Sequence, residues 1–167
     1  MKFENIVEFA RFLWGTAISA PQIVVLKCLC GLPLDSAERA IWRRYCETRI
    51  FARYNPQEFL QALILGGRQV GKSVQIGSTI LLWESICVER AIPEGTRWTA
   101  LVLTPTLKQS TFGKAVEKMR TIPELWSLVE TDCESDGLIQ LANQVDLQAV
   151  AAIPRHARGP TAFLVLL

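Results

Sequence analysis

Hydrophobic positions in the first part of the chain recur at helical spacing and predict a run of helices. The first helix is marked by five apolar residues on one face: Phe3, Ile6, Val7, Ala10 and Trp14. Gly15 marks its end, and Pro21 and Gly31 mark the start and the end of a second helix. Residues 35–38, Asp-Ser-Ala-Glu, match a capping box that opens a third helix, and Asn55-Pro56 interrupts the pattern.

Beyond the third helix, short apolar runs alternate with amphipathic stretches. Residues 59–65 predict a buried strand, residues 72–90 a helix, and residues 98–104 a second buried strand. A capping box at residues 106–109 predicts another helix, which ends at Pro123. The apolar face of that helix consists of Phe112, Ala115, Val116 and Met119.

The last part of the chain predicts a loop followed by strands. Residues 131–137, TDCESDG, read as a surface loop, and residues 138–141 and 145–152 as two short strands paired in a hairpin. Residues 162–167 form a last apolar strand. Strands that alternate with helices indicate an α/β fold, here a mainly parallel sheet flanked by helices.

A glycine-rich loop lies between the first predicted strand and the helix that follows it. Its eight residues fit the phosphate-loop pattern G-x-x-x-x-G-K-[ST]: Gly66, Gly67, Arg68, Gln69, Val70, Gly71, Lys72 and Ser73. Glycines let successive N–H groups turn toward a phosphate, and the helix N-terminus adds partial positive charge. This motif, called Walker A, predicts ATP as ligand, with Lys72 reaching the β- and γ-phosphates and the Ser73 hydroxyl on Mg²⁺. The fold class is therefore a P-loop NTPase.

Two readings of this loop stay open. The glycines alone would also suit a simple turn before a helix. Arg68, inside the loop, either contacts the γ-phosphate or is a solvated arginine beside the site.

Composition and charge exclude several classes of protein. The net charge of +2 is too small to indicate a partner, and the 5 cysteines are scattered and odd in number, which is typical of reduced thiols. Cys28 and Cys30 lack a second ligand pair, and His156 is the sole histidine, so a metal site of the zinc type is not expected. No uninterrupted apolar run is long enough to cross a bilayer.

Several segments together resemble the large terminase subunits of tailed bacteriophages, the ATPase motors that package DNA. "ISAPQIVVLKCLCGLPL" is similar to the N-terminal lead-in of that family, and "GGRQVGKS" to its arginine-bearing Walker A loop. "ALVLTPTLKQS" resembles the strand and loop known as motif Ia. "ARGPTAFLVLL" resembles the approach to Walker B, and the likeness extends over essentially the whole chain.

The resemblance implies a viral genome-packaging role in the bacterial host cytoplasm, encoded by a bacteriophage or prophage. An intact member is a hydrolase that couples ATP hydrolysis to translocation of double-stranded DNA into a procapsid. Its partners are the portal protein and the small terminase subunit, and it acts as a homo-oligomeric ring. Residues 1–58 correspond to the helical lead-in and residues 59–167 to the ATPase core. A lead-in glutamine contacts adenine in the family, and here Gln22 or Gln57 matches it.

The resemblance also implies an Asp-Glu pair directly after the last strand, and the sequence has none there. The expectation is a truncated core that binds nucleotide without catalytic acids and without the nuclease domain. Four acids elsewhere are expected to be solvated: Asp132, Glu134, Asp136 and Asp146. The alternatives are another P-loop NTPase, such as a helicase-like translocase or a nucleotide kinase, and a non-functional prophage remnant.

Arginines cluster before the glycine loop, in a stretch that also contains aromatic residues. They are Arg39, Arg43, Arg44, Arg49 and Arg53. One hypothesis is a grip on duplex phosphates without sequence reading. The favoured interpretation is a core of aromatics with the arginines on a solvated face beside Glu38 and Glu47. Lys108 and Gln109, after motif Ia, are weaker nucleic-acid candidates.

Overall fold

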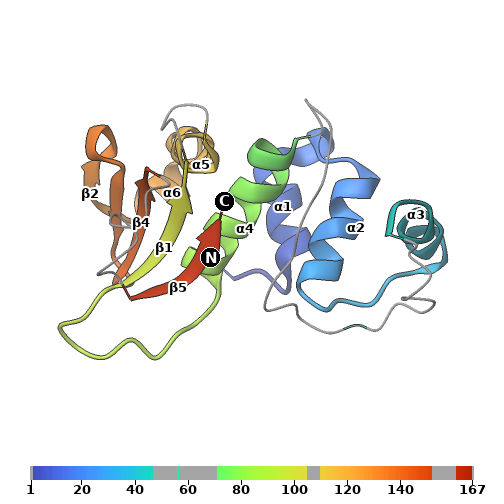
Figure 1. The fold of residues 1–167 in the computed structure, drawn as a ribbon, viewed down its shortest axis with the longest axis horizontal. Helices are drawn as coiled ribbons and strands as arrows, with labels where there is room; N and C mark the ends of the chain where they lie inside the picture. Colours follow the sequence, from blue (N-terminus) through green and yellow to red (C-terminus); the bar gives the residue numbers. More distant parts are fainter. Residues whose placement is uncertain (1, 47–55, 57–70, 105–109, 152–160, 167) are drawn as a thin grey trace. The chain divides into compact units, whose positions relative to one another are not determined.

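The computed structural model describes residues 2–46, 56, 71–104, 110–151 and 161–166. They group into two compact units, one over Phe3–Ile76 and one over Gly77–Leu167 with the first two residues (Figure 1). The predicted boundary at residue 58 and the predicted strand at 59–65 lie outside the described residues. Within the described ranges, no helix is both long and apolar enough to span a membrane.

The described part of the first unit contains three α-helices, as the hydrophobic pattern predicts. Helix α1 covers Ile6–Trp14 and buries Ile6, Val7, Phe9, Ala10 and Leu13. The side chain of Asn5 caps its N-terminus by accepting hydrogen bonds from the backbone N–H groups of residues 7 and 8. At its end Gly15 has φ 56°, a conformation that favours glycine, and the short 3₁₀ turn η1 (Gly15–Ala17) follows.

Helices α2 (Ala20–Leu29) and α3 (Ser36–Cys46) are joined by a capping arrangement that the sequence predicts. Asp35 Oδ1 accepts from the Glu38 N–H at 2.8 Å, and Glu38 Oε2 accepts from the Asp35 N–H at 2.9 Å. The same Glu38 carboxylate forms an ion pair of 2.6 Å with Lys27 Nζ of α2. Glu38 thus both starts α3 and ties it to α2.

The second unit is built on an open five-stranded sheet with the order β2-β3-β4-β1-β5. The strands are β1 (Trp98–Leu103), β2 (Val129–Cys133), β3 (Leu138–Leu141), β4 (Val145–Val150) and β5 (Ala162–Leu166). Strand β1 pairs in parallel with β4 and with β5, whereas β3 pairs antiparallel with β2 and with β4. The fold is α/β as predicted, but the sheet is mixed rather than mainly parallel.

The two antiparallel pairs explain the difference from the predicted sheet. The hairpin of β3 and β4 is confirmed, with Ile139 opposite Leu147. The segment TDCESDG, however, is not all loop, since its first residues complete strand β2 and only Glu134–Asp136 form a 3₁₀ turn (η4). Gly137 closes that turn at φ 74° and leads into β3.

Helices pack beside the sheet and complete the core (Figure 1). One helical run consists of η2 (Lys72–Gly77), α4 (Ser78–Leu82) and η3 (Trp83–Cys87), with π-type turns at both ends. Helix α5 (Thr111–Arg120) packs against α4 and β4, and the short α6 (Pro123–Trp126) follows it. The predicted apolar face of α5 is confirmed, because Phe112, Ala115, Val116 and Met119 are all fully buried.

Two predicted helix boundaries differ from the structure. The N-cap of α5 is Ser110, whose Oγ accepts from the Gly113 N–H at 3.1 Å, and the predicted cap at residues 106–109 lies outside the described residues. Pro123 does not end α5, which stops at Arg120; it instead starts α6. A proline in the first turn of a helix loses no hydrogen bond, so this position suits it.

Arg97 anchors the start of the parallel strands. Its Nε donates to Asp146 Oδ1 at 2.6 Å and its Nη2 to the Leu141 carbonyl at 2.7 Å, while Nη1 lies 3.3 Å from Glu130 Oε2. One side chain thereby links β1 to β2, β3 and β4. Asp146 was expected to be solvated; instead only 17% of its side chain is exposed, because the guanidinium covers it.

Candidate functional site

The end of the predicted phosphate loop is described by the structure from Gly71 onward. Gly66, Gly67, Arg68, Gln69 and Val70 lie outside the described residues, as does the alternative adenine contact Gln57. Gly71 has φ 74°, and helix η2 begins at the next residue, Lys72. The Gly71 carbonyl accepts from the N–H groups of Gln75 (2.8 Å) and Ile76 (3.1 Å) and so caps the first turn.

This local geometry has a physical cause in the sequence. A left-handed residue costs an L-amino acid roughly 1–2 kcal/mol, whereas glycine adopts it freely. A left-handed residue next to helical ones turns neighbouring N–H groups toward one side, which is the arrangement that binds anions. Gly71 thus leads directly into the helical turn that begins at Lys72.

Gln22 and Gln75 meet at Gly71. A Cβ atom built on Gly71 would lie 2.4 Å from Gln22 Nε2 and 2.0 Å from Gln75 Oε1, so both side chains reach over this glycine. The Gln22 Oε1 accepts from the Ser19 N–H at 2.8 Å at the start of α2. Of the two glutamines expected to contact adenine, the structure therefore brings Gln22 next to the glycine loop.

Gln75 was not among the residues predicted for the site. It lies four residues after Gly71, and positions separated by four residues share one face of a helix. That spacing was the signal in the sequence that could have identified it.

The described part of the loop fits a phosphate group with bound Mg²⁺ in two respects. Ser73 lies in the first turn of the helix and is exposed, so its hydroxyl is accessible to a hydrated cation. The helix N-terminus offers N–H donors to an anion. No group of three His, Cys, Asp or Glu side chains within the described ranges is arranged to hold a metal.

Several acidic side chains of the second unit pair with arginines. Asp132 and Glu134 contact Arg120 at 2.7 and 2.5 Å, and the hydrogen bond from Arg120 holds the pKa of the Asp132 carboxyl below its usual value. These two acids were expected to be solvated, and the structure shows them as partners in an ion-pair network on the surface. Asp136 is exposed, as expected.

Burial makes one of the described cysteines a poor nucleophile. Cys28, Cys30, Cys87 and Cys133 are half-buried thiols that take no part in disulfide bonds. Burial raises the pKa of the Cys87 thiol to about 11, so it remains protonated and poorly nucleophilic at neutral pH.

A hollow of about 370 Å³ lies elsewhere in the second unit. Its lining includes Arg90, Asn143 and Val145. The guanidinium of Arg90 is held by Glu84 and by the Phe163 ring, whose centroid is 4.0 Å away. Val145 begins β4, so the hollow lies at the amino ends of the parallel strands, whereas open α/β sheets bind ligands at the carboxyl ends.

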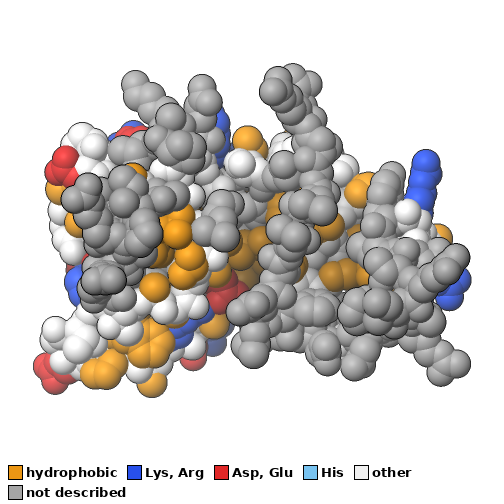
Figure 2. All heavy atoms as spheres, viewed as in Figure 1, with side chains coloured by type: hydrophobic (Ala, Val, Ile, Leu, Met, Phe, Trp, Pro, Cys, Tyr) orange, Lys and Arg blue, Asp and Glu red, His pale blue; other side chains and the backbone are white. Residues whose placement is uncertain are grey.

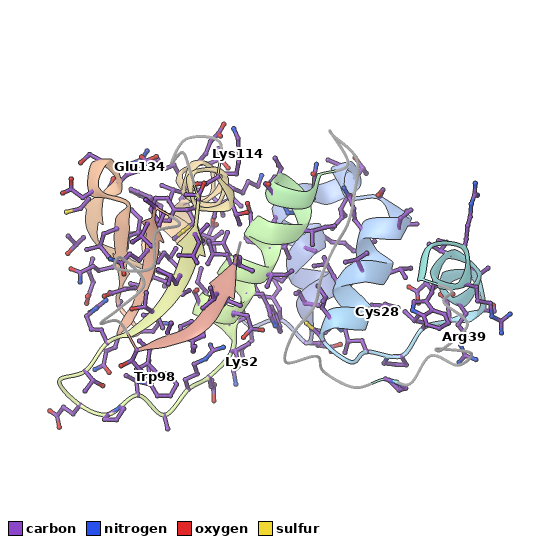
Figure 3. The ribbon with its side chains drawn as sticks, in the orientation of Figure 1. Lys2, Cys28, Arg39, Trp98, Lys114 and Glu134 are labelled. Carbon is purple, nitrogen blue, oxygen red and sulfur yellow. The ribbon has the colours of Figure 1, made fainter. Side chains whose placement is uncertain are left out.

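The basic residues divide between described and undescribed segments. Arg39, Arg43 and Arg44 lie on α3 and are exposed (Figure 3 labels Arg39). The other basic and polar candidates fall outside the described residues: Arg49, Arg53, Lys108 and Gln109.

Replacing Gly71 with alanine is expected to destabilise the first unit by about 2 kcal/mol, because the left-handed conformation is strained and two glutamine side chains must move. Gly95→Ala is the matched control. Gly95 has φ 77° with nothing within 4 Å of an added Cβ, so only the backbone strain of about 1 kcal/mol applies. Chemical denaturation followed by hydrogen exchange measures the loss of unfolding free energy in both variants. An equal loss in the two would show that steric contact with the two glutamines does not contribute at position 71.

Fold and site together define an α/β protein with a mixed sheet, helices beside it, and a glycine-led helix start at Lys72. Comparison with protein-family models, with characterised proteins and with solved structures gave no match to this chain.

Proposed function

We propose that this chain binds ATP·Mg²⁺ as part of a P-loop NTPase. The observation that carries the proposal is the left-handed Gly71 followed at once by a helix that begins at Lys72. The pattern G-x-x-x-x-G-K-[ST] requires this junction, with backbone N–H groups directed at the phosphates and Lys72 reaching them. Ser73, exposed in the first turn, supplies the hydroxyl for Mg²⁺.

The residues around Gly71 suggest what else contacts the nucleotide. Gln22 Nε2 lies beside this glycine and carries two N–H donors. It is the proposed protein contact to the nucleotide from the helical lead-in. Its Oε1 is held by the Ser19 N–H, which fixes the direction of the amide.

We further propose that the NTPase is a terminase large subunit, in which ATP hydrolysis translocates double-stranded DNA into a procapsid. The combination of lead-in, Walker A, motif Ia and Walker B approach supports this. The parallel pairing of β1, from the motif Ia segment, with β5, from the Walker B approach, is compatible with it. The same proposal includes two partners, the portal protein and the small terminase subunit. It also includes assembly into a homo-oligomeric ring and a location in the host cytoplasm.

Lys72→Ala tests the proposal through nucleotide binding. Loss of a charge-assisted contact of about 1.5–3 kcal/mol is expected to weaken ATP·Mg²⁺ binding about 10- to 100-fold in isothermal calorimetry. Lys114→Ala is the control, since Lys114 lies on α5 and pairs with Glu117. No binding by the unmodified chain, or equal affinity in Lys72→Ala, would contradict the proposal.

A further inference from the structure

The hollow at the amino ends of the parallel strands has both apolar and polar walls. Its apolar walls include the half-buried or buried side chains of Val88, Ile92 and Val145, and its polar lining consists of Glu89, Arg90 and Asn143. Its volume of about 370 Å³ lies within the range of about 300–1,000 Å³ that is typical of sites for small molecules. Hydrophobic side chains reach the surface along this edge of the second unit in Figure 2, where β1 and β5 begin in Figure 1.

Arg90 does not offer its charge to a ligand, because other groups of the protein already hold it. Its guanidinium donates to the carbonyls of Glu84 and Val88 and to the Glu84 carboxylate. The Phe163 ring covers the guanidinium, with its centroid 4.0 Å from Arg90 Cζ. Only 14% of the Arg90 side chain is exposed. An anionic ligand would have to compete with Glu84, so Arg90 closes one wall of the hollow instead of attracting an anion.

The unbalanced charge at the hollow is negative. Glu89 is exposed, and its carboxylate forms no ion pair with any residue in the described ranges. The helical run ends at Cys87, between two lining residues, and the C-terminal end of a helix carries a partial negative charge. Arg97 also reaches this end of β4, but Asp146 and Glu130 balance its charge. The hollow therefore favours a cation over an anion.

Asn143 adds a hydrogen-bond acceptor to the exposed side of the hollow. Its Nδ2 donates to the Ser85 carbonyl at 2.7 Å, which fixes the orientation of the amide. The other amide atom, Oδ1, is an acceptor, and no donor in the described part of the chain reaches it. A ligand with N–H groups would supply the missing donor.

We propose that this hollow binds a small organic amine. The protonated amino group lies toward Glu89 and Asn143 Oδ1, and the apolar part of the molecule lies against Val88, Ile92 and Val145. An ammonium group has three N–H donors, which suit a carboxylate and an amide oxygen. Burial of the apolar part supplies most of the affinity, because ion pairs with an exposed carboxylate contribute little, and the charge selects amines among apolar molecules. The glycine loop takes no part, so this inference is independent of ATP binding.

The test compares three probes that share an indole ring and a two-carbon arm and differ in the group at its end. Tryptamine carries an ammonium group, tryptophol a hydroxyl and indole-3-propionate a carboxylate. Each is titrated into the unmodified, nitrogen-15-labelled chain, and the amide chemical shifts are followed by NMR. Tryptamine is expected to shift the signals of residues 86–92 and 143–145 in a saturable way. Tryptophol is expected to bind at least about 3-fold more weakly, and indole-3-propionate more weakly still.

Glu89→Gln removes the charge and keeps the shape of the side chain. It is expected to weaken tryptamine binding at least about 3-fold and to leave tryptophol binding unchanged. Glu94→Gln is the matched control, since Glu94 is exposed in the same connection and does not line the hollow, and it is expected to bind tryptamine as the unmodified chain does. Val88→Trp fills the hollow and is expected to abolish binding of all three probes. Equal unfolding temperatures show that the variants fold.

Several results would overturn the proposal. They are the absence of saturable shifts with tryptamine, shifts confined to residues away from the hollow, and equal affinity for tryptamine and tryptophol. An equal loss of tryptamine binding in Glu89→Gln and Glu94→Gln would also overturn it, as would full affinity in Glu89→Gln. A folded Val88→Trp variant that still binds tryptamine would show that the probe occupies another place.

Discussion

Phe112→Ala is expected to destabilise the second unit by about 3–5 kcal/mol, because it removes a fully buried aromatic ring and leaves a cavity. Phe112 lies on the buried face of α5, the helix that packs against α4 and β4. Much of a typical domain stability of about 5–15 kcal/mol would be lost. Urea unfolding with hydrogen exchange read separately for each unit measures the effect.

Phe12→Ala serves as the control, since the same atoms are removed from a ring that is 40% exposed. The Phe12 ring packs at a tilt of 46° against the Phe3 ring, with centroids 5.2 Å apart, and aromatic pairs contribute about 0.5–1.5 kcal/mol. A cost near that value is expected, confined to the first unit. If both variants lost the same stability, burial of Phe112 would not be the source of its effect.

Arg97→Met is expected to cost the second unit about 2–3 kcal/mol, because it leaves Asp146 and the Leu141 carbonyl without their guanidinium donor. Methionine keeps most of the apolar stem, so the loss reports the hydrogen bonds. The same denaturation experiment measures the cost. Strands β3 and β4 near Leu141 and Val145 are expected to exchange fastest, since Arg97 joins them there.

Arg120→Met is the matched comparison, since Arg120 also bridges two acids, Asp132 and Glu134, but is 43% exposed on its side chain. Ion pairs at such a surface contribute about 0–1 kcal/mol and weaken in salt. A cost below about 1 kcal/mol is expected, and it should vanish at high salt. A larger cost for Arg120→Met than for Arg97→Met would contradict the role assigned to burial.

Local signals in the sequence were enough to locate most helices and the central strands. Gly15 and the Asp35–Glu38 pair act within a few residues, so the end of α1 and the start of α3 could be predicted from the local sequence. Strand β2 was not predicted, because its residues are mostly polar and it is stabilised by antiparallel pairing with β3. Pairing with a partner strand overrides a weak local preference, and a polar edge strand resembles a loop.

The candidate site was only partly visible in the sequence. The glycine pattern located Gly71, Lys72 and Ser73, because spacing alone defines a phosphate loop. The approach of Gln22 to Gly71 joins segments far apart in the chain, and no periodicity encodes such a contact. The prediction that Asp146 is solvated was wrong for the same reason. Its hydrogen-bond partner Arg97 is 49 residues away in the sequence, so no local pattern indicates the contact.

The π-type turns at both ends of the helical run from Lys72 to Cys87 change which of its residues share one face of the helix. A π turn holds one more residue than an α turn, so each one rotates the following positions by roughly 100° relative to a regular helix. Residues on either side of such a turn therefore do not share one continuous hydrophobic stripe. Trimming one residue at Trp83–Cys87 would restore regular winding and turn Ser85, now fully enclosed, to a different side of the helix.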